Sequence, residues 1–203
     1  MTLDLPDDSI VSRVAAALMP LSIDDGSDEI KRKGQRRASV LMPLVMRGQW
    51  NVILTQRPMT MPRHPGQISF PGGRREEKET AQEAALRETH EEIGVAPQAI
   101  KVLGRLPSFD AVSEYRVTPF VGIVDPRAKI IPCAREVDSV FEVPFSFVMN
   151  PNNHIVRDVS FDGREHRLYD MPYTEVDGTY RNIWGMTAMV MRTLYERGFK
   201  NAD

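Results

Sequence analysis

Cysteine and long hydrophobic runs are what this sequence lacks most clearly. Its 203 residues include a single cysteine, Cys133. One cysteine excludes an internal disulfide and any zinc site built from several cysteines, and it is typical of a protein in a reducing compartment. No apolar run approaches the roughly 18–20 residues that a membrane-spanning helix needs, so we expect no membrane partner.

A strong net charge is also absent. The chain has 26 Lys and Arg residues against 28 Asp and Glu residues, a formal net charge of -2. Such a balance provides no global basic field that would recruit nucleic acid or an anionic membrane. The acidic start lacks the basic and apolar segments of a signal peptide, and the final Asn-Ala-Asp is not a peroxisomal signal. We therefore expect a cytoplasmic protein without a nucleic-acid partner.

What is present is an acidic segment, residues 80–93, that contains neither proline nor glycine. Thr80 and Glu83 have the spacing of a capping box, which predicts a helix beginning at Thr80 and ending before Gly94. Its predicted buried side consists of residues repeating every four positions: Ala81, Ala85, Thr89 and Ile93.

Three glutamates meet on one face of this predicted helix. Glu88, Glu91 and Glu92 stand at i, i+3 and i+4, where like charges destabilise a bare helix by a few tenths of a kcal/mol per pair. A bound cation would remove this repulsion, and clustered carboxylates suit Mg²⁺ or Mn²⁺. The alternative is a solvated acidic face without a ligand.

The glutamates belong to a longer pattern that resembles the Nudix box. The matching positions are Gly73, Glu79, Arg87, Glu88, Glu91, Glu92 and Gly94. Thr89 departs from the pattern, because an aliphatic residue is usual there. The resemblance implies an α/β fold, an α/β/α sandwich on a central mixed β-sheet that carries the acidic helix.

The resemblance also implies the chemistry, which is metal-dependent cleavage of a phosphoanhydride. It implies Mg²⁺ or Mn²⁺ held by Glu88, Glu91 and Glu92, with the backbone carbonyl of Gly73 as a further ligand. Glu88 and Glu92 are then the catalytic carboxylates. Arg87 is expected to pair with Glu79 and to point away from the metal-binding face.

A proline-rich loop over residues 54–73 precedes the box and resembles the signature of the coenzyme A diphosphatase branch. The matching residues are Leu54, Thr55, Arg57, Arg63, His64 and the run from Gly66 to Gly73. Pro58 and the adjacency of Arg63 and His64 depart from that signature. Arg57, Arg63 and His64 are candidate substrate-binding residues, because arginine binds phosphate bidentately; alternatively, each anchors the loop on a carboxylate.

A further catalytic glutamate is expected downstream of the box. Glu136 is the best match to the Glu-Val found in the coenzyme A diphosphatase branch, and Glu142 and Asp138 are its rivals. Nothing in the residue pattern separates a catalytic role of Glu136 from a surface role.

The rest of the chain divides into residues 1–36, a helix over 8–18 followed by a flexible charged linker over 24–34, and residues 37–203, the Nudix domain. Pro43 predicts an edge strand or a bulge within the strand over 38–46. The other predicted elements are strands over 50–55, 99–106 and 118–124, a hairpin over 154–169 about Asp162 and Gly163, a loop over 171–178 and a helix over 186–194.

Three functions are compatible with these features. The favoured one is hydrolysis of coenzyme A or its derivatives to 3′,5′-ADP and 4′-phosphopantetheine. The second is hydrolysis of ADP-ribose or another nucleoside diphosphate derivative, and the third is a Nudix-fold binding module without turnover. The sequence leaves the oligomeric state open, including a homodimer.

Overall fold

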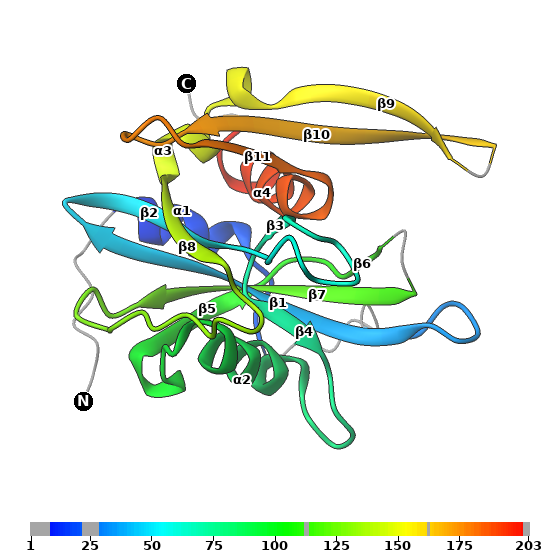
Figure 1. The fold of residues 1–203 in the computed structure, drawn as a ribbon, viewed down its shortest axis with the longest axis horizontal. Helices are drawn as coiled ribbons and strands as arrows, with labels where there is room; N and C mark the ends of the chain where they lie inside the picture. The colour runs from blue at the N-terminus through cyan, green and yellow to red at the C-terminus, as the bar shows by residue number, and fades with distance from the viewer. Residues whose placement is uncertain (1–8, 22–28, 112–113, 162, 201–203) are drawn as a thin grey trace.

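The computed structural model describes residues 9–21, 29–111, 114–161 and 163–200. Its centre is an eight-stranded mixed β-sheet with helices on both faces (Figure 1). The strands are β1 (Arg36–Arg47), β2 (Gln49–Gln56), β3 (Ile68–Ser69), β4 (Gly72–Arg74), β5 (Ile100–Arg105), β6 (Phe109–Asp110), β7 (Tyr115–Val124) and β8 (Ser139–Pro144). The helices are α1 (Ser9–Ala17), α2 (Ala81–Ile93), α3 (Phe145–Val148) and α4 (Gly185–Gly198), with short 3-10 turns at Pro97–Ala99 and Pro151–Asn153.

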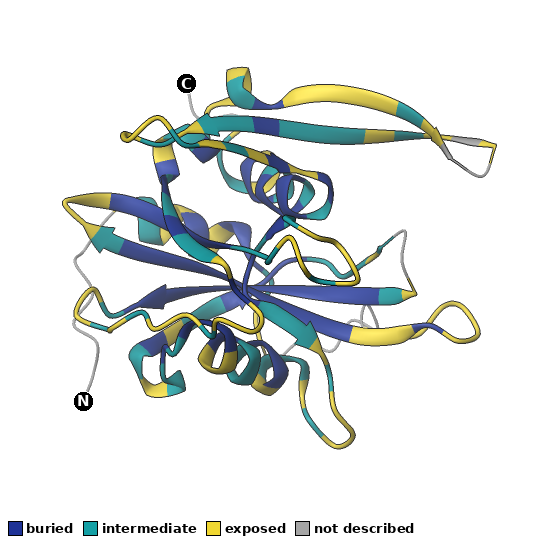
Figure 2. Cartoon of the chain, viewed as in Figure 1, coloured by how far each residue is buried: buried dark blue, intermediate teal, exposed yellow. Residues whose placement is uncertain are grey.

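Strand β1 is the centre of this sheet. It runs parallel to β7, from Arg36 opposite Tyr115 to Val45 opposite Val124, and antiparallel to β2 and β4. Both β1 and β7 are almost continuously buried because layers cover both faces of the sheet, as the dark strands in Figure 2 show. The predicted α/β/α sandwich on a mixed sheet is confirmed.

The two faces of β1 belong to two different hydrophobic clusters. Successive side chains of a strand point to opposite faces. Val40 and Met42 pack in the larger cluster with residues of α1 and α4. Leu41 and Val45 pack in the smaller cluster with residues of α2. A residue on a neighbouring strand therefore lies on the same side of the sheet as the β1 residue directly opposite it.

Pro43 lies within this central strand, so the predicted edge position is wrong. Strand β4 pairs with residues 38–40 of β1, and β2 pairs with residues 44–47. Between them the N–H of Leu41 donates to the Pro71 carbonyl at 2.9 Å. Pro43 lies two residues further on, at the point where β2 and β4 diverge, and it has no N–H. A proline is tolerated there because neither β2 nor β4 pairs with residue 43, so no sheet hydrogen bond is lost.

A second sheet of three antiparallel strands follows: β9 (Ile155–Phe161), β10 (Arg164–Thr174) and β11 (Tyr180–Trp184). Strands β9 and β10 confirm the predicted hairpin, although Asp162 of its turn lies outside the described residues. The predicted loop over 171–178 is wrong in its first half, because Met171 is fully buried and β10 continues to Thr174. Helix α4 lies between this sheet and the larger one (Figure 1).

Helix α1 confirms the predicted N-terminal helix and packs on α4. Val14 is fully buried in the larger cluster, and the guanidinium of Arg13 donates to the Gly198 carbonyl at 3.2 Å. Of the predicted linker over 24–34, residues 24–28 lie outside the described residues. Within the described ranges, no helix is long and apolar enough to cross a membrane.

Candidate active site

Helix α2 begins and ends where the sequence predicts. Thr80 is the N-cap: its hydroxyl accepts from the Glu83 N–H at 3.2 Å, and the Glu83 carboxylate accepts from the Thr80 N–H at 2.8 Å. Gly94 ends the helix in the left-handed region, with φ 72°. Of the predicted buried stripe, Ala85, Thr89 and Ile93 are buried and Ala81 is partly exposed. These caps and the buried side of α2 determine which way its acidic face points.

The three glutamates of α2 differ in their environments. Glu92 is 5% exposed, and its Oε2 has no hydrogen-bond partner among the described residues. Burial raises the pKa of Glu92 to about 8, and the neighbouring Glu88 carboxylate adds to the rise. Burial also raises the pKa of Glu88, against the effect of Arg87. Glu91 is exposed. Two of the three carboxylates therefore lie in surroundings that disfavour their charge.

Arg87 joins these glutamates to the preceding loop. Its guanidinium binds Glu79 bidentately, at 2.8 and 3.1 Å, which agrees with the expected pairing and holds the pKa of Glu79 below its usual value. Its Nη1 also lies 2.9 Å from both Glu88 and Glu91. The expectation that Arg87 points away from the acidic face is therefore wrong. The planar guanidinium has enough N–H donors to bind the loop residue Glu79 and the helix residues Glu88 and Glu91 together.

Strand β4 brings Gly73 against the Glu88 carboxylate. A Cβ at position 73 would lie 2.5 Å from the carboxyl carbon of Glu88 and 2.6 Å from both oxygens. Only glycine leaves room for this approach. The neighbouring Gly72 provides a backbone hydrogen bond to Glu92 that opposes the rise in its pKa. The two glycines thus bring backbone next to two of the acidic side chains.

This donor set fits a hard divalent cation. Within the described ranges, no three acidic, histidine or cysteine side chains lie close enough together to hold a metal ion as they stand, and Nη1 of Arg87 lies 2.9 Å from both Glu88 and Glu91. The buried Oε2 of Glu92 nevertheless lacks a partner, which is unusual for a buried oxygen. Carboxylate and carbonyl oxygens are the ligands that Mg²⁺ and Mn²⁺ prefer.

The three predicted substrate-binding residues lie in unlike surroundings. Arg57 follows β2, its Nε is buried without a partner in the described structure, and its charge opposes the rise in the Glu92 pKa. Arg63 and His64 are exposed, and His64 adopts a left-handed backbone with φ 55°. The charge of Arg57 thus acts on the acidic face, whereas Arg63 and His64 lie on the exposed part of the loop.

Among the downstream acids, Glu136 has an electrostatic effect on the acidic helix. Its charge contributes to the raised pKa of both Glu88 and Glu92, and its side chain is exposed. Glu142 instead pairs with Arg47 at 2.9 Å. The backbone N–H of Asp138 binds the Gln56 carbonyl. Of the three candidates, Glu136 is the one whose charge acts on the α2 glutamates.

Sequence reasoning missed Gln56 and Arg181. The Gln56 amide donates to the Gly66 carbonyl in the loop at 3.3 Å, and the Arg181 guanidinium donates to the Gln56 side-chain oxygen. Arg181 also binds Glu175 at 2.6 Å and the Ser139 hydroxyl at 3.2 Å. No sequence signal connects Arg181 with Gln56, because 125 positions separate them.

Comparison with known proteins agrees with these features. A family model for the NUDIX domain matches residues 35–159, more than half of the chain. The chain is 38% identical over 161 residues to the uncharacterized Nudix hydrolase NudL of Enterobacter sp. (strain 638), covering 79% of this chain and 81% of the relative. It is also 38% identical over 165 residues to that of Salmonella dublin, with 81% and 83% covered.

Two solved structures give weaker matches. A C. elegans Ap4A hydrolase binary complex has a TM-score of 0.47 and 18% identity, covering 55% of this chain and 81% of that one. The M. Smegmatis Nudix hydrolase RenU has a TM-score of 0.48 and 21% identity, with 55% and 72% covered. From the family model and the curated relatives, the chain belongs to the Nudix family of pyrophosphohydrolases.

Proposed function

We propose that this Nudix hydrolase is a coenzyme A diphosphatase. Water attacks one phosphorus of the P–O–P linkage, the bridging P–O bond breaks, and the products are 3′,5′-ADP and 4′-phosphopantetheine. One observation carries the proposal. The loop that resembles the coenzyme A diphosphatase signature ends at Gly73, which lies against the Glu88 carboxylate, and the charge of Arg57 in the same loop acts on the buried Glu92. This position of the loop beside the acidic helix supports the proposal.

Glu88, Glu91, Glu92 and the Gly73 carbonyl are the proposed ligands for Mg²⁺ or Mn²⁺. Nudix hydrolases use divalent cations, and a bound cation would neutralise phosphate charge and make water more acidic. The close approach of Gly73 to Glu88 and the unpartnered Oε2 of Glu92 support this assignment. Arg87 keeps its bidentate Glu79 partner when Glu88 and Glu91 turn to a cation.

The protein groups have distinct proposed roles in the reaction. Glu88, partly buried beside Gly73, accepts the proton of the attacking water, and Glu136 is the alternative catalytic carboxylate. Arg57, which is partly exposed, binds a phosphate oxygen through its guanidinium, which orients the phosphorus for in-line attack. Arg63 and His64, exposed on the same loop, contact the more distant part of the substrate.

ADP-ribose hydrolysis is the second candidate, and it would be favoured if the loop serves only to hold the fold. The purified protein should be assayed with coenzyme A, ADP-ribose and a dinucleotide in the presence of Mg²⁺ or Mn²⁺. We expect the largest kcat/KM with coenzyme A. A larger value with ADP-ribose would overturn the proposal but would leave the Nudix chemistry intact.

The Glu92→Gln variant distinguishes a metal-dependent hydrolase from a binding module without turnover. The amide keeps the size of the side chain but cannot ionise when a cation binds, so we expect the metal-dependent activity to fall by at least 10²-fold. Glu196→Gln is the control, because Glu196 lies on α4 and pairs with Arg192. Unchanged activity of Glu92→Gln would show that the metal assignment is wrong. No turnover by the wild type would favour the binding module.

A further inference from the structure

We propose that Arg36 and Arg74 form a subsite for a phosphate monoester of the substrate, distinct from the carboxylates that serve the scissile linkage. This inference rests on the proposed function, in which the phosphate monoester is the 3′-phosphate of coenzyme A. The subsite would explain how the enzyme distinguishes coenzyme A from analogues that share only the pyrophosphate.

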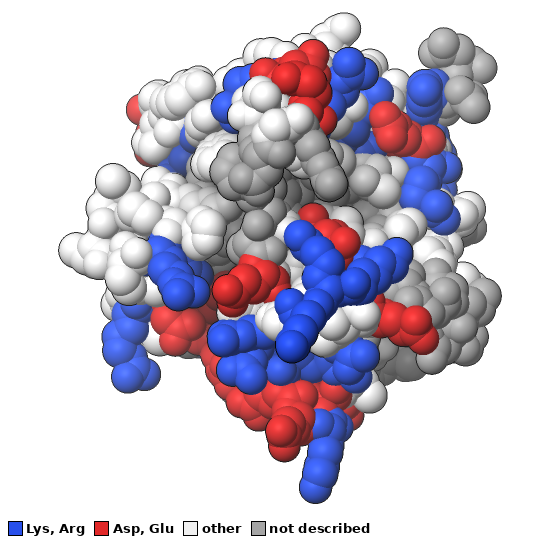
Figure 3. Space-filling model, turned by 90° about the vertical axis from the view of Figure 1, so that its right-hand side faces the viewer, with Lys and Arg blue, Asp and Glu red and all other residues white. Residues whose placement is uncertain are grey.

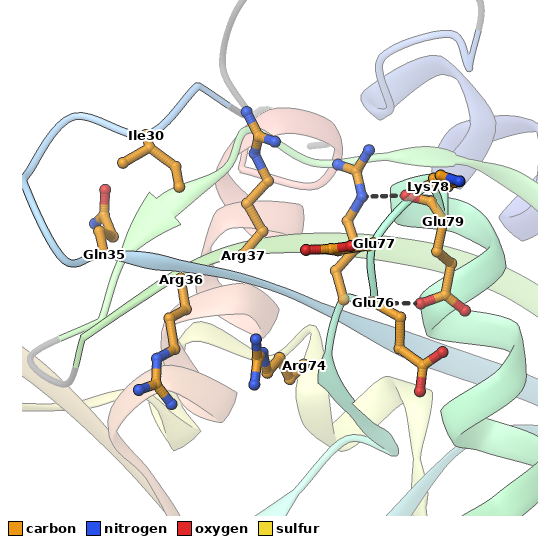
Figure 4. A pocket seen from close by; sticks show the side chains of 10 residues that line it. Ile30, Gln35, Arg36, Arg37, Arg74, Glu76, Glu77, Lys78 and Glu79 are labelled. Carbon is orange, nitrogen blue, oxygen red and sulfur yellow. Dashed lines mark hydrogen bonds between the residues drawn. The ribbon is translucent and has the colours of Figure 1, made fainter.

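A cavity of about 540 Å³ lies at the start of β1 and the end of β4. Five of its lining residues are basic, and three are acidic (Figure 4). Basic side chains gather on the face of the molecule that Figure 3 shows. The lining residues are Ile30, Gln35, Arg36, Arg37, Arg74, Arg75, Glu76, Glu77, Lys78 and Glu79.

Arg36 and Arg74 lie on the same face of the sheet. Arg74 is directly opposite Ala38 in the β1–β4 pair, and Arg36 is two residues before Ala38. Residues diagonally opposite in this way lie roughly 7–8 Å apart, within joint reach of one phosphate group. Figure 4 shows both side chains on one side of the β1 strand and Arg37 on the other.

Neither guanidinium is neutralised by the described part of the protein. No hydrogen bond or ion pair involves the side chain of Arg36 or Arg74 there, and both residues are exposed. The nearby Glu79 is already bound by Arg87. Two neighbouring guanidinium groups of like charge favour a dianion, and a phosphate monoester offers oxygens for bidentate hydrogen bonds to both.

The subsite lies next to the acidic face but on the other side of β4. Gly73 faces Glu88, and Arg74, the next residue, points to the opposite face. In the described sheet β4 pairs with β1 alone, and on its other edge Arg87 binds the Arg74 carbonyl at 3.0 Å, so no further strand separates the two faces there. The 3′-phosphate and the 5′-pyrophosphate of coenzyme A are carried by one ribose. With that ribose at the edge of β4, the 3′-phosphate would reach the face with Arg36 and Arg74, and the 5′-pyrophosphate would reach the face with Glu88.

The test compares coenzyme A with 3′-dephospho-coenzyme A in wild type, Arg36→Gln and Arg74→Gln. We expect each variant to lower kcat/KM about tenfold for coenzyme A, mainly through KM, because it loses charged hydrogen bonds to the phosphate. With dephospho-coenzyme A we expect less than a twofold change. Arg127→Gln is the control, since exposed Arg127 follows the far end of β7 and pairs with Asp125.

A direct binding measurement separates this inference from the proposed function. Wild type should bind adenosine 3′,5′-bisphosphate at least tenfold more tightly than AMP, and both variants should lose this difference. Equal losses with both substrates, or unchanged discrimination in the variants, would overturn the subsite. If wild type cleaves ADP-ribose but neither coenzyme A nor its dephospho form, the proposed function fails, and the binding measurement alone decides on the subsite.

Discussion

Gly73→Ala provides a test of the geometry that we assign to the site. The added Cβ would lie 2.5 Å from the Glu88 carboxyl carbon, whereas ordinary van der Waals contact begins at 3.4 Å. The carboxylate must therefore move by about 0.9 Å (3.4 minus 2.5). Strand β4 cannot easily retreat instead, because Gly73 is paired with Ser39 and the Arg74 carbonyl accepts from Arg87 at 3.0 Å.

A displacement of this size has a large expected effect on the reaction. Misplacing a reacting group by about 1 Å can cost roughly 10²-fold in rate, equivalent to about 2.7 kcal/mol of activation free energy. We expect kcat/KM of Gly73→Ala to fall by about this factor and its stabilisation by Mg²⁺ or Mn²⁺ to decrease. The assays are steady-state kinetics with coenzyme A and thermal melting with and without the cation.

Gly122→Ala is a matched control in the same sheet. Its Cβ would meet Ile100 at 3.0 Å and Leu41 at 3.3 Å, so it disturbs apolar packing and no carboxylate. We expect a lower melting temperature with kcat/KM within threefold of wild type. If Gly73→Ala kept full activity and cation response, neither catalysis nor cation binding would depend on the position of the Glu88 carboxylate beside β4. The assignment of Glu88 would then be refuted.

Two further predictions concern residues outside the Nudix box. Arg181→Met keeps packing against Phe141, over which the guanidinium lies at 4.5 Å, but it loses the hydrogen bond to Gln56. We expect KM for coenzyme A to rise several-fold, since a charged hydrogen bond contributes about 1.5–3 kcal/mol; unchanged KM would contradict the proposed link to the loop. Burial lowers the pKa of His154, so the unfolded protein binds a proton at a higher pH than the folded protein does. The free energy of unfolding should therefore have its full value above about pH 6.5 and decrease as the pH falls toward the lower folded pKa. Urea unfolding from pH 7 to 5 should show a smaller decline in His154→Gln, and equal declines would refute this cause.

Local interactions explain what the sequence could predict. The capping box of Thr80 and Glu83 and the C-terminal Gly94 lie within one segment, so the bounds of α2 follow from neighbouring residues. The buried runs of β1 and β7 likewise follow from their apolar residues. Pro43 was placed wrongly because its tolerance depends on where two other strands leave β1, which no local pattern records.

The contacts that the sequence could not predict join distant segments. Arg87 reaches Glu79, Glu88 and Glu91 at once, although its spacing indicated only the first partner. Arg181 lies beyond the residues matched by the family model, yet it binds Gln56 within them. Such contacts depend on the packing of whole elements, and a charged residue in one sequence offers no signal for its partner.

The buried polar atoms without partners bear on whether the acidic face is merely solvated. In the described part of the chain there are three: Ser39 Oγ, Arg57 Nε and Glu92 Oε2. Ser39 is directly opposite Gly73, and the charge of Arg57 acts on Glu92, so all three belong to the surroundings of the acidic helix. Water already satisfies a solvated face, whereas buried polar atoms nearly always have partners. A phosphate with its divalent cation would bring oxygens to the arginine and positive charge to the glutamate together, which favours a ligand-binding site over a surface of solvated carboxylates.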